Sequence, residues 1–93
     1  MVVGYANILI RLFGINSLKE KRSVVKSLVN ELQKRFGISV IESGKQDSKD
    51  YIMLGIAFAA ISEKDCEAKM DSIENFLELI HTVEVFTYDF HHF

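Results

Sequence analysis

Hydrophobic residues alternate with other residues from Met1 to Phe13 and again from Tyr51 to Ile61, which is the period of a β-strand. The first strand has one wholly apolar side, made of Ala6, Ile8, Ile10 and Leu12. The second has a large-residue side, made of Ile52, Leu54, Ile56 and Phe58. Ile38 to Ser43 and Val83 to Phe93 also predict strands. In the last one Val83 and Val85 compete with Phe86, Tyr88 and Phe90 for the buried side, so both assignments stay open.

The segment from Ser17 to Phe36 has the spacing of an amphipathic helix. Ser17 can accept a hydrogen bond from the N–H of Glu20, whose carboxylate can reach back to the N–H of Ser17. Gly37 can supply the left-handed residue that ends the helix. The predicted buried stripe contains Leu18, Val25, Leu28, Val29, Leu32 and Phe36.

A second helix is predicted after Ser62, which can cap its first turn. Its apolar stripe contains Cys66, Met70, Ile73, Leu77 and Ile80. Its exposed side is acidic and contains Glu67, Asp71, Glu74 and Glu78.

The resulting order is βαββαβ, with Gly44 to Asp50 as a hairpin loop. This order predicts an α+β, ferredoxin-like sandwich, in which a four-stranded antiparallel sheet carries both helices on one face. Right-handed crossovers place the first and third strands in the centre. The other face of the sheet is then open, and its apolar residues are candidates for an oligomer interface. They are Tyr5, Leu9, Phe13, Met53, Gly55, Ala57 and Ala59.

The 93 residues are enough for one domain, residues 1–93, with a single core. No apolar run reaches the roughly 20 residues of a membrane span, and the N-terminus lacks the pattern of a secretory signal. A lone cysteine, Cys66, fits a reducing compartment, so we expect a cytoplasmic protein without a membrane partner. The acidic sequence pI of about 5.9 argues against non-specific coating of nucleic acid.

The net charge of −2 conceals a segregation of charge between the two helices. The first helix, with its cap, has six basic and two acidic residues, whereas the segment from Ser62 to Glu84 has two basic and seven acidic residues. Lys19, Arg22 and Lys26 follow one another at helical spacing and form one basic ridge, with Lys21 on the opposite flank. These four cations are the candidate nucleic-acid contacts. The alternative is a solvated helix face, whose cations could also pair with acids of the second helix.

Other chemistry has little support in the sequence. His91 and His92 point to opposite faces of a strand and His81 precedes a turn, so no metal site is expected. Cys66 lies in the buried stripe, and no catalytic motif or cofactor fingerprint is present. Acylphosphatases share this fold and hold phosphate with an arginine in the loop before the first helix. The loop here, Gly14 to Asn16, contains no arginine, so acylphosphatase activity is disfavoured. Backbone N–H groups at the start of that helix could still bind an anion.

RNA-recognition motifs also share this fold and display aromatic residues on the third strand. Here that strand presents Met53, Gly55, Ala57 and Ala59, so base stacking of that kind is missing. Only Tyr5 and Phe13 could supply any. If RNA is bound, its phosphates should be contacted by the first helix.

Three stretches carry a resemblance to a known family: Met1 to Gly4, the run SLKEKR from Ser17 to Arg22 with the following VVKSL, and Gln46-Asp47. Together they resemble the bacterial YlxP-like family, a domain of unknown function. The resemblance extends over essentially the whole chain. It implies a ferredoxin-like fold and a cytoplasmic bacterial protein whose gene often lies near genes for translation initiation and ribosome maturation factors. The motif positions that carry over are Ser17, Lys19, Glu20, Lys21, Arg22, Lys26, Gln46 and Asp47.

The sequence therefore favours a non-enzymatic accessory protein, without cofactor or metal, that contacts RNA or a ribosomal particle through Lys19, Lys21, Arg22 and Lys26. A homodimer joined through the open sheet face is the alternative from another class. A small-molecule or anion-binding domain is the third hypothesis, and it rests only on the versatility of the fold.

Overall fold

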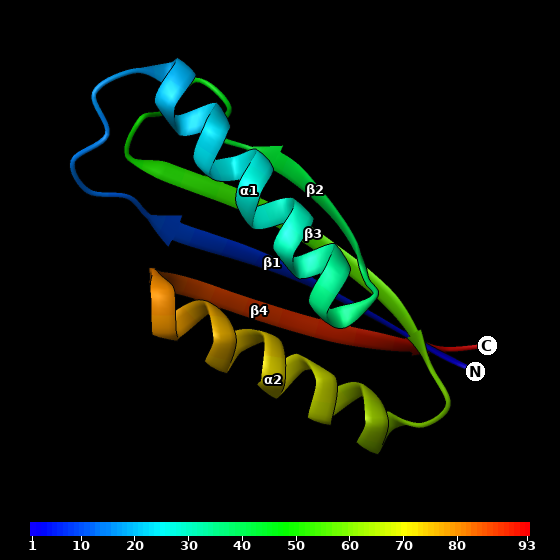
Figure 1. Ribbon diagram of the computed structural model, residues 1–93. Coiled ribbons are helices and arrows are strands. Elements are labelled where there is room, and N and C mark those ends of the chain that lie inside the picture. The colour runs from blue at the N-terminus through cyan, green and yellow to red at the C-terminus, as the bar shows by residue number, and fades with distance from the viewer.

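The computed structural model describes residues 1–93 and contains four strands and two helices. In chain order they are β1 (Val2–Arg11), α1 (Leu18–Phe36), β2 (Ser39–Gly44), β3 (Tyr51–Ala60), α2 (Glu63–Ile80) and β4 (Thr82–His92). The strands pair antiparallel in the order β2-β3-β1-β4, and both helices lie on one face of the sheet (Figure 1). The predicted ferredoxin-like architecture, with the first and third strands in the centre, is confirmed.

Buried and exposed residues alternate along β1 and β3 because helices cover only one face of the sheet. Every second residue of these strands is buried under α1 and α2: Ala6, Ile8, Ile10, Ile52, Leu54, Ile56 and Phe58. Ile8 pairs with Leu54 and Ile10 with Ile52, so large side chains from both strands meet in the centre. The predicted core faces of β1 and β3 are confirmed.

Helix α1 begins and ends at the predicted residues. The Ser17 hydroxyl accepts a hydrogen bond from the Glu20 N–H at 3.1 Å. The Glu20 carboxylate accepts from the N–H of Asn16, at 3.2 Å, and not from that of Ser17 as we expected, so the reciprocal bond reaches one residue further back. Gly37 has a φ of 63° and donates its N–H to the carbonyl of Gln33, which closes the helix.

The inward face of α1 differs from the predicted stripe at three positions. Val25, Leu28 and Leu32 are buried, whereas Leu18, Val29 and Phe36 are half-buried at the flank. Lys21 shares the spacing of the buried residues and is itself fully buried. The helix is therefore rotated so that a lysine takes a core position.

Helix α2 is capped by Ser62, whose hydroxyl accepts from the Asp65 N–H at 3.2 Å. Cys66, Met70, Ile73 and Leu77 are buried as predicted, but Ile80 is 52% exposed, because the helix ends there beyond the edge of the core. The helix lies very close to β1. A Cβ atom added to Gly4 would lie 2.5 Å from Cys66 Sγ, so only glycine permits this approach.

An irregularity in the pairing of β4 with β1 explains why the buried side of β4 was ambiguous in the sequence. Leu9 pairs with Val85 but Ile10 pairs with Val83, so Glu84 is an extra residue at this point. Because of this β-bulge, Val83, Phe86 and Phe90 all pack against the core, and Val85 is turned to the open face. Both competing assignments are therefore correct in part.

The molecule is elongated, with extents of 43 × 21 × 21 Å. At one end, called the hairpin end below, β1 stops, α1 starts and the β2–β3 hairpin turns (Figure 1). The N–H of Leu12 donates to the carbonyl of Asp50 there, at 2.7 Å. At the other end the two termini meet, since the N–H of Phe93 donates to the carbonyl of Met1 at 2.8 Å. Neither α1 nor α2 combines the length and the hydrophobicity of a membrane-spanning helix.

Candidate functional site

The basic ridge on α1 is exposed and free of internal partners. Lys19, Arg22 and Lys26 are exposed, and no carboxylate lies within 4.0 Å of their charged nitrogens. Ion pairs in the molecule form elsewhere, for example between Arg35 and Glu31 at 2.9 Å within α1. The alternative in which the ridge pairs with acids of the second helix is therefore not what the structure shows. Three unneutralised cations remain available to an external anion.

Lys21 does not belong to this exposed surface. Its side chain has no solvent exposure, its Nζ lies 2.8 Å from Glu42 Oε2, and it donates a hydrogen bond of 2.7 Å to the carbonyl of Lys45. The Oε2 atom of Glu42 is buried, and the Lys21 ammonium is its only polar partner. Lys21 thus fastens α1 to the β2–β3 hairpin. Our expectation that it contacts nucleic acid is wrong, because a buried and paired ammonium cannot reach a phosphate.

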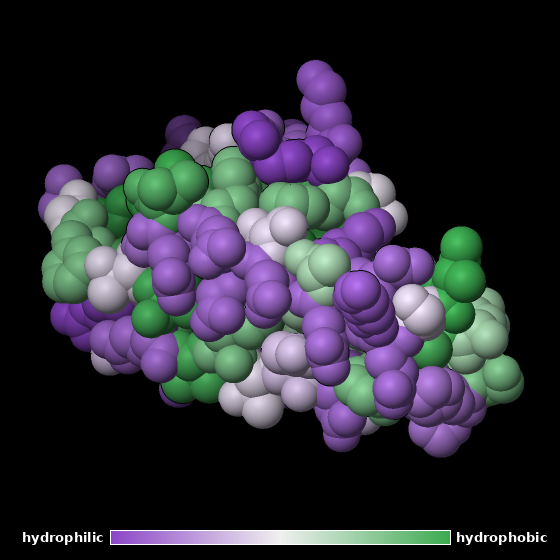
Figure 2. Space-filling model, turned by 90° about the horizontal axis from the view of Figure 1, so that it is seen from below, coloured by the Kyte–Doolittle hydropathy of each residue, from purple (hydrophilic) through white to green (hydrophobic).

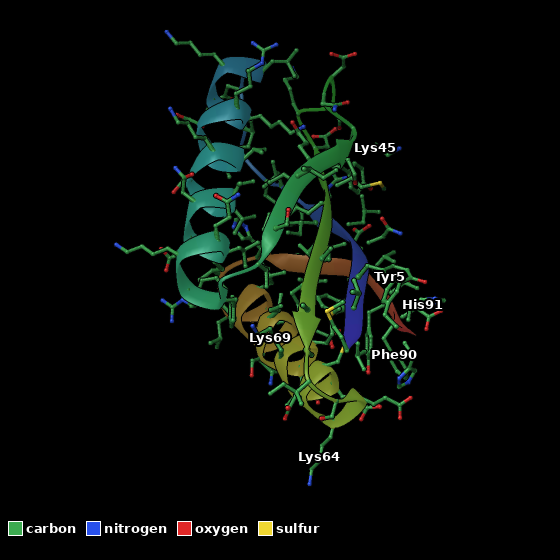
Figure 3. All side chains as sticks on the ribbon, turned by 90° about the vertical axis from the view of Figure 1, so that its right-hand side faces the viewer. Tyr5, Lys45, Lys64, Lys69, Phe90 and His91 are labelled. Carbon is green, nitrogen blue, oxygen red and sulfur yellow. The ribbon has the colours of Figure 1, made fainter.

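The hairpin loop lies beside the start of α1. Lys45, labelled at the tip of the hairpin in Figure 3, has a φ of 59° and an exposed side chain. Gln46 donates a hydrogen bond from Nε2 to the carbonyl of Glu42 at 3.3 Å, whereas the Asp47 side chain is exposed. Gln46 thus stabilises the turn.

The open face of the sheet carries the predicted apolar residues. Tyr5, Phe13 and Ala59 are exposed, and Leu9, Met53, Gly55 and Ala57 are half-buried. Figure 3 shows Tyr5 and His91 on the side of the sheet away from α1. Gly55 and Ala57 form part of a shallow hollow of about 290 Å³ that Tyr5 and Ile41 also line. Sequence reasoning did not include Ile41 and Val85, which are 62% and 44% exposed on this face.

An arginine–aromatic cluster at the hairpin end was also missed. The Arg11 guanidinium carbon lies 4.9 Å from the ring centroid of Tyr51 and 5.4 Å from that of Phe13. Arg11 Nη1 donates a hydrogen bond of 3.0 Å to the Tyr51 hydroxyl, and this bond raises the pKa of the guanidinium above its ordinary value. The signal was present in the sequence, because Tyr51 has the same strand parity as Met53 and pairs with Arg11.

A groove of about 620 Å³ separates α1 from α2 and was not predicted. Val24, Leu28, Phe76 and Ile80 give it apolar walls, and Glu31, Arg35 and His81 line it as well. Arg35 lies over the Phe76 ring at 4.4 Å from its centroid. Burial lowers the pKa of His81 below its ordinary value. If a small ligand binds, this groove has the size and the mixed lining that such sites require.

The acidic side of the molecule is on α2. Figure 2 shows hydrophilic residues over much of the face seen from below, where α2 lies in front, with hydrophobic residues at both ends. Burial, and then repulsion from Glu78 and Asp71, raises the pKa of the Glu74 carboxyl. Cys66 is buried as predicted, and burial raises the pKa of its thiol. No group of three or more His, Cys, Asp or Glu side chains lies close enough together to hold a metal ion.

Comparison with known proteins decides the family. Residues 3–90 match a family described as "Protein of unknown function (DUF503)". The chain belongs to this family. It is 31% identical over 86 residues to the "Uncharacterized protein YlxP" of Bacillus subtilis (strain 168), an alignment that covers 88% of this chain and 94% of that relative. The YlxP-like resemblance drawn from the sequence motifs is confirmed.

In this member of the DUF503 family, the SLKEKR run divides into two groups of residues. Ser17, Glu20 and Lys21 form internal contacts that start α1 and attach it to the hairpin. Lys19 and Arg22 make no such contact and extend the exposed basic surface toward Lys26. One motif thus provides both the anchoring of the helix and its unpaired charge.

Proposed function

We propose that this protein is a non-enzymatic accessory factor of the bacterial cytoplasm that binds RNA or a ribonucleoprotein through Lys19, Arg22 and Lys26. The observation that carries the proposal is the absence of any carboxylate within 4.0 Å of these three exposed cations. The gene neighbourhood implied by the YlxP-like resemblance, among translation and ribosome maturation factors, agrees with it.

Phosphate is the anion that this ridge fits best. Three like charges on one helix face repel one another, and a chain of phosphates relieves that repulsion at all three positions at once. Binding then releases condensed counterions, so affinity falls steeply with salt. The acidic side of α2 repels a second phosphate backbone, which favours one orientation of the protein on its RNA.

The test compares two variants that carry the same net charge. K19A/R22A/K26A removes the ridge, and the control K34A/K64E lowers the net charge by the same amount at two exposed lysines outside it, by one unit at Lys34 and two at Lys64. Lys21 stays unchanged in both, because its loss would disturb the fold. Binding to single-stranded RNA and co-sedimentation with ribosomal particles are measured over a salt series.

We expect the ridge variant to lose most of the affinity at low salt and the control to retain it. With three phosphate contacts, the slope of log affinity against log salt should flatten by about 2 for single-stranded RNA. Equal losses in the two variants would show that only net charge matters. If the wild-type protein binds neither RNA nor ribosomal particles at low salt, the proposal is wrong.

The second candidate function is a homodimer joined through the open sheet face. It is favoured by an exposed side chain that lies beside a hollow on that face. The exposed Tyr5 side chain lies next to the space above Gly55 and Ala57, and an isologous interface requires such a self-complementary pair in one patch. Light scattering at high micromolar concentration tests it directly. A strictly monomeric protein would rule the homodimer out, whereas a dimer abolished by I41K, a change on the exposed part of this face, would support it.

A further inference from the structure

We propose that Arg11, Phe13 and Tyr51 form a stacking site for one nucleobase of a single-stranded RNA. The ligand class rests on the function proposed above, whereas the site is separate from the basic ridge. The ridge would hold phosphates and this cluster would hold a base. The two sites lie at the same end of the molecule (Figure 1), since Phe13 is in the turn that leads from β1 to α1.

Two aromatic rings and one guanidinium meet in this cluster. The guanidinium of Arg11 contacts the faces of both rings, and its hydrogen bond to the Tyr51 hydroxyl fixes its orientation. No carboxylate lies within 4.0 Å of the guanidinium, so its charge is not neutralised by an ion pair. A base would therefore meet a guanidinium that is already oriented beside two aromatic rings.

Within this cluster, Phe13 is the residue that most requires a partner. Its side chain is 69% exposed, although burial of a phenylalanine is strongly favourable, and it lies just beyond the end of β1. Arg11 and Phe13 also line a hollow of about 420 Å³ at the hairpin end. Ile80 adds an apolar wall to this hollow, and His81, Thr82 and Glu78 add polar groups.

This combination fits a nucleobase better than a free anion. A base has apolar faces that stack on a ring and polar edges that hydrogen-bond, and the hollow offers both kinds of contact. A free anion would gain from Arg11 but not from Phe13.

The first experiment compares an oligonucleotide that carries bases with an abasic one of the same length and phosphate number. The ridge should bind both, so any preference for the first reports the base site. Wild type should prefer the base-bearing strand by about fivefold or more, the range of one stacking interaction. F13A should remove this preference and leave the affinity for the abasic strand unchanged. F93A is the matched control, because Phe93 is 74% exposed at the opposite end.

The second experiment places a fluorescent reporter in the site. The chain has no tryptophan, so F13W introduces a single one, and I61W introduces one at an 89% exposed position near the terminal end. Base-bearing RNA and adenosine monophosphate should quench F13W strongly and I61W weakly. The abasic strand and ribose 5-phosphate should quench neither.

The outcomes separate the two proposals. Equal affinity for the base-bearing and abasic strands would overturn the stacking site and leave the phosphate ridge intact. If neither strand nor ribosomal particles bind but adenosine monophosphate quenches F13W more than I61W, the RNA function is wrong and the base site stands. Equal quenching of both reporters, with no strand preference, overturns the site whatever the ridge does.

Discussion

The Lys21 ammonium and the Glu42 carboxylate lie 2.8 Å apart across the junction of α1 and β2, with 0% and 21% of their side chains exposed. The two partners are thus unequal, because Glu42 keeps some contact with water and Lys21 keeps none. An unpaired charge is costly to bury, so the lysine depends on the pair more than the glutamate does.

Removal of Glu42 should therefore destabilise the protein more than removal of Lys21. We expect E42A to lower the free energy of unfolding by about 3 kcal/mol, since it leaves the Lys21 charge buried without a counter-ion. K21M should cost clearly less, because a methionine fits an apolar position and Glu42 can turn to solvent. Urea unfolding of both variants and of K21M/E42A measures this. Equal losses in the two single variants would contradict the asymmetry.

The contact between β1 and α2 at Gly4 predicts a coupled pair of substitutions. G4A should cost about 1 to 3 kcal/mol, because its Cβ would lie 2.5 Å from Cys66 Sγ. C66A removes that sulfur atom at the expense of a small cavity. The loss in G4A/C66A should be smaller than the sum of the two single losses, as measured by thermal or urea unfolding. Strict additivity would show that Cys66 is not what excludes a side chain at Gly4.

The two faces of β4 predict opposite tolerance at two consecutive positions. Phe86 packs against the core, so F86A should lower the free energy of unfolding by about 2 kcal/mol. Val85 is 44% exposed on the open face, so V85T should change it by less than about 0.5 kcal/mol. Chemical unfolding measures both effects, and the reverse result would show that Val85 and not Phe86 faces the helices.

His81 predicts a loss of stability at mildly acidic pH. Burial lowers its folded-state pKa below the ordinary value of about 6.5, so its neutral form is favoured in the folded protein. As the pH falls below about 6.5, the unfolded chain binds a proton that folded His81 resists, and the free energy of unfolding decreases. Above that pH, His81 contributes no such dependence.

The control for this effect is H81Q, which keeps a polar side chain but cannot titrate. Urea unfolding between about pH 7.5 and 5.5 should show a steeper decline in wild type than in H81Q. An NMR titration of the His81 ring should give a midpoint below 6.5. Parallel stability curves for the two proteins would rule out His81 as the source.

The sequence predicted the elements, their order and most of the core, because the periodicity of β1, β3 and both helices agrees with their caps. It misassigned Lys21 because a lysine was assumed to face solvent. Yet Lys21, Val25, Leu28 and Leu32 share one helical spacing, and the structure buries all four. The spacing alone indicated which side of the helix is buried, but the charge of Lys21 argued against placing it there.

The candidate surfaces were predictable where they depend on one element and not where they depend on several. The ridge lies on a single helix, so its exposure followed from spacing alone. The groove beside Phe76 depends on the separation of α1 from α2, and the exposure of Val85 depends on one extra residue in β4. No local pattern encodes either. The Arg11 cluster is an intermediate case, because predicting it required only the register of β1 against β3.

The hydrogen-bonded termini give the protein a nearly closed backbone. A short linker between Met1 and Phe93 would turn the chain into a ring without moving any strand, and a reopened ring should keep the same sheet. A fluorophore, affinity tag or fused domain at either terminus would also project from the end that faces away from the ridge and the aromatic cluster. Such attachments should leave both surfaces free for the binding measurements.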